Sequence, residues 1–354
     1  MRVLMTGSDG YLGTVMLPVL TEAGHVVQGM DTGFFHGCGF GVTPWGGDGD
    51  HASGRRIDVR DVEADDLRSF DAVIHLAALS NDPLGDLDPG LTEAINRDAS
   101  VRLARLARAA GVRRFLFASS CSLYGVAGED EVDETAPFNP ITPYGRSKVE
   151  VEAALKELAV DEFSPTSMRN ATAYGVSSAL RLDVVVNNLV AHAVATGRVM
   201  LKSDGSPWRP LVHVEDIARA FLAVLEAPRD RVHARAFNVG RTEENYQIRE
   251  VAELVAEAVG GSEVQVAEGA GADPRSYRVN CDLIQEALPG FRPRWTVPEG
   301  IRELRNALVE HGFGREELED QRYVRLREIR RLLEEDRISA ELRWAGSGEP
   351  SAVS

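Results

Sequence analysis

The chain begins with a regular alternation of short apolar runs and amphipathic helical patterns. Apolar residues dominate Arg2–Thr6 and His25–Met30, and a helical pattern through Val19 to Ala23 separates them. Short apolar runs bounded by turn residues are typical of buried strands, whereas apolar positions spaced three and four apart indicate helices. Strands that alternate with helices predict a parallel sheet with helices on both faces. Later runs of the same kind lie at Ala72–Leu76, Phe115–Phe117 and Thr166–Met168.

From residue 171 onward the pattern becomes mixed. We expect a helix at Val184–Gly197, a hairpin-like segment at Val199–Arg209 and a short strand at Ala236–Gly240. Residues 301–344 are densely charged, yet apolar residues recur there at helical spacing, which predicts an extension packed on the body or on a second subunit. The expected fold is α/β, a doubly wound parallel sheet with a smaller mixed α/β region. The expected divisions are 1–170 (with parts of 211–240 returning to it), 171–304, a helical extension at 305–345 and a disordered tail at 346–354.

The turn after the first strand is rich in glycine and holds Gly7, Gly10, Tyr11, Leu12 and Gly13. Glycines let the backbone approach a pyrophosphate closely, and the amino end of the following helix favours its negative charge. Asp31 ends the second strand, where a carboxylate accepts hydrogen bonds from a ribose 2′-hydroxyl and repels a 2′-phosphate. Strand, glycine turn, helix, strand and acidic residue together predict a Rossmann-type unit that binds NAD rather than NADP.

Small and polar residues at the later strand ends are further candidates for the cofactor. Parallel strands end at one edge of a sheet, and ligands bind in the crevice outside that edge. Asp58 is placed to reach an adenine amine, although it is equally suited to cap the next helix. The candidates beyond the glycine turn and Asp31 are Asp58, Val59, Leu76, Ala77, Ala78 and Asn96.

Tyr144 and Lys148 stand four residues apart in a helix expected at Ile141–Leu158. At this spacing both side chains project from one helix face. An ammonium group beside a phenol stabilises the phenolate and lowers a pKa that starts near 10, giving a proton acceptor near neutral pH. Taken alone, the pair is more typical of an ordinary helix surface.

Composition narrows the possible partners. The 354 residues are 44% hydrophobic and 27% charged, and a formal net charge of −16 disfavours nucleic acid or an anionic membrane. Arg209 and Arg275 are still candidates for binding a diphosphate, with surface solvation as the alternative. Three distant cysteines without paired spacing predict free thiols and no metal site. The sequence has no apolar run of about 18 residues, and its first residues are too short an apolar run for a signal peptide, so we expect a cytoplasmic protein.

Taken together, the glycine turn, Asp31, the Ser120 strand end and Tyr144-x-x-x-Lys148 resemble the extended short-chain dehydrogenase/reductase family. Within that family the sequence is most similar to NAD-dependent nucleotide-sugar epimerases and dehydratases. The resemblance implies that Tyr144 is the acid/base and that Lys148 lowers its pKa and holds the nicotinamide ribose. It further implies that Ser120 hydrogen-bonds the reacting sugar oxygen, and that the protein is a homodimer.

The same resemblance implies where a nucleoside-diphosphate sugar would bind. Two arginines would hold the diphosphate, an asparagine pair would assist, and hydroxyl groups near the strand ends would contact the sugar. Thr172 stands where related enzymes often have Asn, which weakens the expectation at that position. The expected substrate contacts are Ser80, Ser122, Thr172, Asn187, Asn188, Arg209 and Arg275.

The two residues after Ser120 distinguish between the reactions that this family catalyses. Sugar 4,6-dehydratases of this family carry Asp-Glu directly after the Ser/Thr position, whereas this chain has Cys121 and Ser122 there. We therefore expect a 4-epimerase of a nucleoside-diphosphate hexose, working through a 4-keto intermediate. The alternatives are an NAD(P)H-dependent 4-ketoreductase of a 4-keto-6-deoxysugar and a non-catalytic NAD-binding sensor. The sequence leaves the base and the sugar open.

Overall fold

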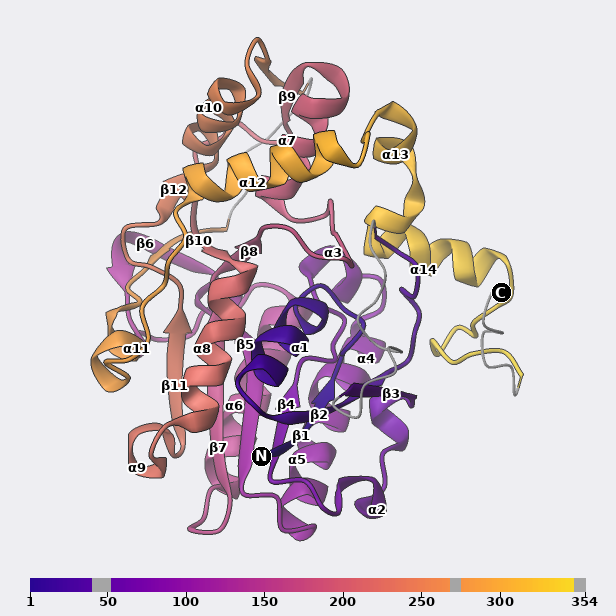
Figure 1. Ribbon diagram of the computed structural model, residues 1–354, viewed down its shortest axis with the longest axis vertical. Helices are drawn as coiled ribbons and strands as arrows, with labels where there is room; N and C mark the ends of the chain where they lie inside the picture. Colours follow the sequence, from indigo (N-terminus) through magenta and orange to yellow (C-terminus); the bar gives the residue numbers. More distant parts are fainter. Residues whose placement is uncertain (40–51, 268–274, 347–354) are drawn as a thin grey trace.

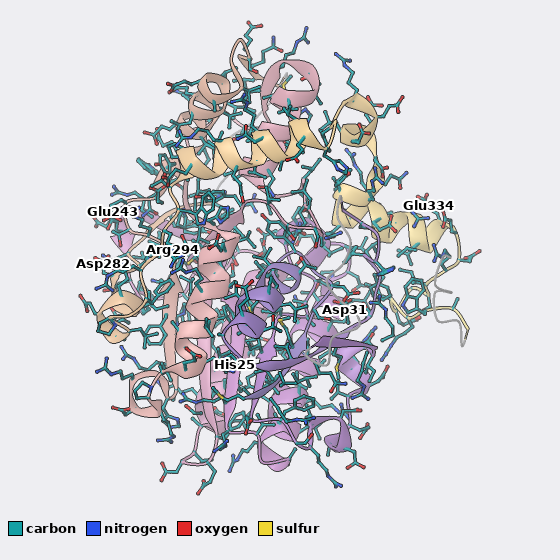
Figure 2. All side chains as sticks on the ribbon, viewed as in Figure 1. His25, Asp31, Glu243, Asp282, Arg294 and Glu334 are labelled. Carbon is teal, nitrogen blue, oxygen red and sulfur yellow. The ribbon has the colours of Figure 1, made fainter. Side chains whose placement is uncertain are left out.

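The computed structural model of the protein describes residues 1–39, 52–267 and 275–346. A parallel sheet flanked by helices forms one part of the molecule, and α7, α10 and α12 gather in a second part above it (Figure 1). Exposed charged side chains such as Glu243, Asp282 and Glu334 lie on the outside (Figure 2). Residues 347–354 of the tail expected at 346–354 lie outside the described residues. Among the described helices, none is long and apolar enough to cross a membrane.

The main sheet is seven-stranded, and every neighbouring pair in it is parallel. The order β11-β7-β5-β4-β1-β2-β3 reverses direction between β1 and β4, where a parallel α/β sheet opens a crevice at its carboxyl edge. The predicted doubly wound sheet is thus confirmed. Its strands are β1 (Arg2–Thr6), β2 (Val26–Asp31), β3 (Ala52–Arg56), β4 (Ala72–His75), β5 (Arg114–Ser120), β7 (Ser164–Asn170) and β11 (Arg235–Val239).

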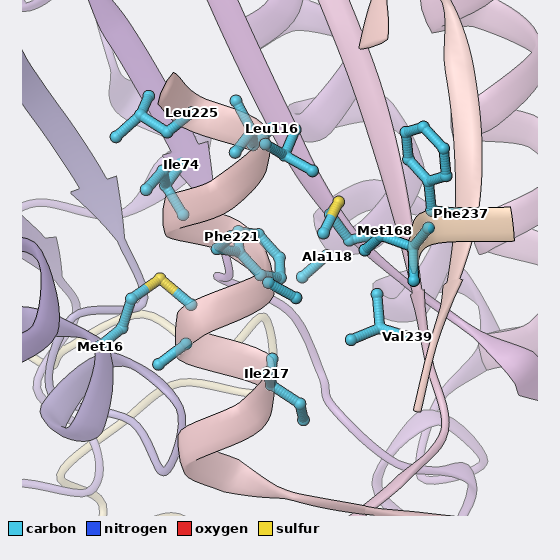
Figure 3. Packing of buried hydrophobic residues seen from close by; sticks show 14 of the residues in the cluster. Met16, Ile74, Leu116, Ala118, Met168, Ile217, Phe221, Leu225, Phe237 and Val239 are labelled. Atoms are coloured by element: carbon cyan, nitrogen blue, oxygen red, sulfur yellow. The ribbon is translucent and has the colours of Figure 1, made fainter. Parts of the chain in front are cut away.

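Helices cover both faces of this sheet. On one face α1 (Gly13–Glu22) packs beside α8 (Val214–Glu226), and on the other lie α5 (Ala99–Ala109) and α6 (Pro143–Leu158). Ile217, Phe221 and Leu225 repeat at four-residue spacing along α8 and form one apolar stripe. Figure 3 shows this stripe directed at strand residues of the sheet, which buries it.

The second part is built from short strands and three helices around a separate hydrophobic cluster. We expected a hairpin at Val199–Arg209, and this was wrong. β9 (Arg198–Leu201) pairs with β13 (Glu263–Val266), while β10 (Trp208–His213) pairs with β8 (Thr172–Tyr174) and β12 (Asn245–Gln247). The helices here are α7 (Val185–Thr196), α10 (Ile248–Val259) and α12 (Val297–Glu310). β6 (Val126–Val132) pairs with β14 (Ser276–Val279), and α11 (Asp282–Ala287) packs against β11; buried residues of β14 and α11 belong to the main-sheet cluster.

Shorter elements lie between the main strands. A helical turn, η1 (Val59–Asp61), follows β3. The helical segment before β5 contains a wider π-type turn, η2 (Glu93–Asp98), between α4 (Pro89–Thr92) and α5. The shorter helices are α2 (Ala64–Leu67), α3 (Asp82–Gly85), η3 (Cys121–Tyr124) and α9 (Arg229–Val232).

The C-terminal region is helical, as its charge and spacing predicted. α12 runs unbroken through residue 305, where we placed a boundary, and its Leu304 and Leu308 belong to the cluster of the second part. α13 (Arg315–Glu319), η4 (Gln321–Tyr323) and α14 (Arg325–Glu334) follow. α14 then returns to the main sheet's part of the molecule, where Ile329 and Leu332 join the cluster beneath α5 and α6.

Candidate functional site

A cavity of about 790 Å³ opens at the carboxyl edge of the main sheet. Its floor consists of residues at and just beyond the ends of β1, β2, β4 and β5, and its far wall comes from α7, β9 and β10 of the second part. This is the position that the strand order predicts for a ligand, next to the switch between β1 and β4.

The glycine turn forms a close-packed cradle in this cavity. Gly7 has φ +73°, and a Cβ at that position would lie 2.7 Å from the Ala77 nitrogen; at Gly10 it would lie 3.1 Å from the Gly7 oxygen. Side chains are therefore excluded where a ligand must approach the backbone. The first turn of α1 carries no acidic residue, so the helix amino end is free to favour an anion. These features fit a dinucleotide pyrophosphate.

Asp31 lies at the end of β2 and lines the cavity. Its carboxylate accepts hydrogen bonds from the Asp9 amide at 3.1 Å and the Gly33 amide at 2.8 Å. Burial, followed by the nearby Asp9 charge, raises the pKa of Asp31 to about 6. The Arg56 guanidinium forms an ion pair with Asp9. Asp31 is thus held in place and keeps its negative charge only above about pH 6.

Of the two functions considered for Asp58, the structure shows the capping role. Its carboxylate accepts from the Arg60 amide at 2.8 Å, and an ion pair with the Arg60 side chain occupies its second oxygen at 2.6 Å. Asp58, Val59 and Arg60 all line the cavity. Leu76, Ala77 and Ala78 line it as well, as do Tyr11 and Leu12. The Tyr11 hydroxyl is already used, because it donates to the Gly175 oxygen at 2.7 Å.

Asn96 and Asn187 do not line the cavity, contrary to expectation, and both are buried. Asn96 accepts from the Leu79 amide at 2.8 Å and donates to the Leu79 oxygen at 3.0 Å, so it positions the loop after β4. Asn187 accepts from the Gly175 amide and donates to the Tyr11 hydroxyl. Both amides are satisfied internally, and neither faces the cavity. Gly13 also lies outside the lining, where it begins α1.

Ser120, Tyr144 and Lys148 converge where β5 ends beside α6. All three line the cavity, and Ser120 and Tyr144 share a hydrogen bond. The Lys148 Nζ atom donates to the Ala118 oxygen at 2.7 Å and lies 5.4 Å from the centre of the Tyr144 ring. Thr142 caps α6 by accepting from the Gly145 amide, which fixes the start of the helix just before Tyr144.

The pKa values of Tyr144 and Lys148 differ from what the sequence led us to expect. We expected Lys148 to lower the pKa of Tyr144, but burial and then the Asp82 charge raise that pKa to about 12. The Ser120 hydrogen bond and the Arg181 charge oppose this rise. Burial lowers the pKa of Lys148 to about 7, with Glu152 acting against it. The lysine is therefore the group of the pair that titrates near neutral pH.

The arginines expected at a diphosphate lie together on the cavity wall. Arg209 donates to the Trp208 oxygen at 2.8 Å and to the Arg275 oxygen, and its guanidinium lies 5.6 Å from the Tyr277 ring centre. Arg275 forms an ion pair with Asp82. Two guanidinium groups in one wall match the charge of a diphosphate.

The remaining expected contacts, Ser80, Ser122, Thr172 and Asn188, also line the cavity. The Asn188 amide donates to the Leu182 oxygen at 2.8 Å. The Ser122 hydroxyl and the side-chain oxygen of Asn170 are buried there without a hydrogen-bond partner among the described residues. Buried polar atoms without partners cost free energy, and a bound ligand with hydroxyl groups would satisfy them.

A buried ion pair at Arg181 and Asp183 was missed in reading the sequence. The Arg181 guanidinium pairs with Asp183 at 2.7 Å and donates to the Ser80 hydroxyl at 2.9 Å. Asn81 donates to the same aspartate at 2.8 Å. Burial disfavours the charged form of Arg181. The nearby negative charge of Asp183 outweighs this effect and raises the pKa of Arg181. Opposite charges two residues apart in an otherwise apolar stretch were the available signal.

Known proteins match this chain along most of its length. The model of the NAD dependent epimerase/dehydratase family matches residues 3–240. A UDP-glucose 4-epimerase of Streptomyces lividans is 30% identical, with 82% of this chain and 91% of the relative covered. A second UDP-glucose 4-epimerase, from Mycolicibacterium smegmatis, is 28% identical, with 85% and 96% covered. The family description names NAD, which the glycine cradle and Asp31 fit.

Solved structures of other proteins are also similar to this chain along most of its length. MoeE5 in complex with UDP-glucuronic acid and NAD is 27% identical, with a TM-score of 0.75 over 88% of this chain and 99% of that one. A dTDP-glucose 4,6-dehydratase from Streptomyces venezuelae reaches a TM-score of 0.77 at 21% identity, covering 89% and 99%, and shares the fold.

Proposed function

This chain belongs to the NAD-dependent epimerase/dehydratase family, and from that premise we propose that it is a 4-epimerase of a nucleoside-diphosphate hexose, working through a 4-keto intermediate. The observation that carries the proposal is the set of titratable groups in the cavity. Ser120 and Tyr144 are hydrogen-bonded there beside Lys148. This arrangement suits the transfer of one proton at one sugar oxygen.

The carboxylates of the cavity support epimerisation over dehydration. A 4,6-dehydration needs an acid and a base of its own at the sugar. The described lining contains four carboxylates, and each is already bound by an arginine or by backbone amides; they are Asp31, Asp58, Asp82 and Asp183. The residues after Ser120 are Cys121, which is buried and donates to the Arg169 oxygen, and Ser122. An uncharged proton-transfer group suffices for epimerisation at C4.

The chain's own residues would act on the C4 hydroxyl. When bound, NAD supplies a reversible acceptor for the electrons of the C4–H bond. As a phenolate, formed once its own proton has left to solvent, Tyr144 would take the hydroxyl proton and later return it, and Ser120 would hydrogen-bond the same sugar oxygen through both steps. Because burial holds the pKa of Lys148 at about 7, this lysine can exchange a proton with solvent near neutral pH while Tyr144 works on the substrate.

The opposite wall would hold the nucleotide. Arg209 and Arg275, which line the cavity, would bind the diphosphate. The Ser122 hydroxyl and the Asn170 oxygen, which have no hydrogen-bond partner among the described residues, would bind sugar hydroxyls. The relatives act on or bind UDP-glucose and UDP-glucuronic acid, so UDP-hexoses are the first substrates to test.

The test is incubation of the purified protein with a panel of nucleotide sugars, followed by chromatographic separation of 4-epimers. The panel includes UDP-glucose, UDP-glucuronic acid and the dTDP-, CDP- and GDP-hexoses. We expect interconversion of at least one epimer pair without net change in the oxidation state of added nicotinamide. Absence of interconversion across the panel would contradict the proposal. Consumption of reduced nicotinamide with a 4-keto-6-deoxy sugar would instead identify a ketoreductase.

We propose a homodimer from the family resemblance, and a cytoplasmic location from the three unpaired cysteines and the lack of a membrane-spanning run in the sequence. Light scattering on the purified protein and fractionation of the producing cells test these two points independently of the reaction.

A further inference from the structure

The C-terminal residues 325–345 lie against the part of the cavity that surrounds Asp31. This segment begins with α14, which contacts α3 near the carboxyl edge of the main sheet (Figure 1). It lies beyond the span 3–240 that the family model matches. From the sequence we expected a packed helical extension here and assigned none of its residues to the cofactor or substrate site.

Two side chains of α14 line the cavity itself, Arg325 and Ile329. Arg325 is 2% exposed, and its guanidinium donates to the Ala179 oxygen at 3.0 Å and more weakly to the Cys38 oxygen at 3.5 Å. The same group lies 4.4 Å from the centre of the Phe35 ring. One arginine thus connects the loop after β2 with the loop that leads from β8 into α7.

The residues that follow α14 bind the two loops next to Asp31. The Trp344 indole donates to the Thr32 oxygen at 2.8 Å, and its ring lies 5.4 Å from that of Phe34. Thr32 and Phe34 both line the cavity. These contacts join the C-terminal segment to the loop after β2, directly after the acidic residue that marks the adenosine ribose.

The loop after β3 is bound in the same way. Arg60 donates to the carbonyl oxygens of Glu341 and Leu342, each at 2.7 Å. Arg343 forms ion pairs with Asp58 at 3.4 Å and with Asp61. Asp58 and Arg60 belong to the cavity lining, so the C-terminal segment holds the second loop of the adenosine end as well.

We propose that residues 325–345 are a structural part of the NAD site, which holds the loops after β2 and β3 together around the adenosine half and thereby slows release of the cofactor. A ligand can leave only as fast as the surrounding loops open, and the two loops are fixed here by contacts from a segment 281 to 312 residues away in the chain. The inference depends on NAD being the cofactor and does not depend on which sugar is converted.

Slow release is compatible with the proposed reaction. An epimerase that oxidises and then reduces the same carbon returns NAD to its starting state in each turnover. The cofactor therefore has no need to leave between turnovers, unlike the cofactor of a dehydrogenase. If the adenosine end stays closed, the enzyme keeps its NAD between turnovers. Slow release of NAD then does not limit the rate of turnover.

The experiment measures NAD exchange in the full-length protein. Purified protein is loaded with NAD and mixed with excess isotopically labelled NAD, and replacement of the bound molecule is followed by mass spectrometry. The variants are Trp344→Ala and Arg343→Ala, neither of which lines the cavity. The control is Glu334→Ala, at an exposed position on α14 (Figure 2) whose side chain makes no hydrogen bond or ion pair with the described residues.

We expect Trp344→Ala to release NAD roughly tenfold faster, since it loses an aromatic contact and a hydrogen bond. Arg343→Ala should release it faster by a smaller factor, and Glu334→Ala should match the unmodified protein. Thermal unfolding with and without NAD separates this role from simple stabilisation, because a loosened site reduces the rise in midpoint that NAD produces. NAD exchange within twofold of the control in both variants, with equal losses of midpoint in both conditions, would overturn the inference.

Discussion

Lys148 and Tyr144 share a helix face, but they are not joined by a hydrogen bond among the contacts of the described residues. The lysine Nζ lies 5.4 Å from the centre of the tyrosine ring and donates to the Ala118 oxygen at 2.7 Å. The tyrosine is instead hydrogen-bonded to Ser120. The lysine therefore lies over the tyrosine ring without bonding to its hydroxyl, and each residue can be tested separately.

Tyr144→Phe should lower kcat by roughly 10²–10⁴-fold, because it removes the proton-transfer group and keeps the ring. NAD affinity should change little, since the glycine cradle and Asp31 are untouched. Steady-state kinetics on the substrate found in the panel and calorimetry with NAD measure the two effects. Tyr246→Phe is the matched control, because it removes a phenol hydroxyl outside the cavity lining. Full activity of Tyr144→Phe would remove this residue from the mechanism.

Lys148→Met should stabilise the protein near neutral pH. Burial lowers the pKa of Lys148 from 10.5 to about 7, so between these values the unfolded chain binds a proton that the folded protein does not. Stability of the unmodified protein therefore rises with pH through this window, and below it the lysine costs the fold on the order of 5 kcal/mol. Leaving the Ala118 oxygen without its donor offsets roughly 1–3 kcal/mol of the gain.

Urea unfolding of Lys148→Met and the unmodified protein across that pH range measures this difference. We expect the variant's advantage to shrink as pH rises toward 10.5, where neither state carries the charge. Lys156→Met, at an exposed position on the same helix, should show no such trend. A stability difference that is independent of pH would indicate that Lys148 is charged throughout in the folded protein.

Asp31→Ala should relax the preference for NAD over NADP. Above about pH 6 the carboxylate is charged and repels a 2′-phosphate, and below that value protonation removes the repulsion. In the unmodified protein we therefore expect the ratio of NADP to NAD dissociation constants to fall as pH drops through 6, provided that the fold is retained. Calorimetric titration with both cofactors measures it, with the exposed Asp65→Ala as control. An unchanged ratio in Asp31→Ala would mean that another group excludes the phosphate.

Arg209→Ala should raise KM for the nucleotide sugar by roughly tenfold and leave kcat nearly unchanged, because a diphosphate contact serves ground state and transition state alike. Free nucleoside diphosphate should weaken as an inhibitor by a similar factor. Initial-rate kinetics and inhibition measurements test both, with Lys156→Ala as the control for loss of a positive charge elsewhere. A change confined to kcat would place Arg209 nearer the reacting carbon than we propose.

Residues close in the sequence were sufficient for the parallel sheet, the glycine turn and the helix that carries Tyr144. Periodicity and turn chemistry are local properties, and the position of Gly7 or Asp31 at a strand end follows from a few neighbouring residues. The same logic failed at Asn96 and Asn187. A polar residue on a helix can face a ligand or satisfy a buried backbone group, and only the packing of the next loop distinguishes these.

The sequence by itself determined the fold class and the cofactor type and indicated Ser120, Tyr144 and Lys148 as candidate catalytic residues, because each depends on short motifs. Only the tertiary structure decided how the cavity is charged and closed. Arg275 reaches Asp82 across 193 positions, and Arg60 reaches Leu342 across 282. The pKa values of Tyr144 and Lys148 likewise depend on burial. Such interactions arise from how distant segments pack, which no spacing along the chain encodes.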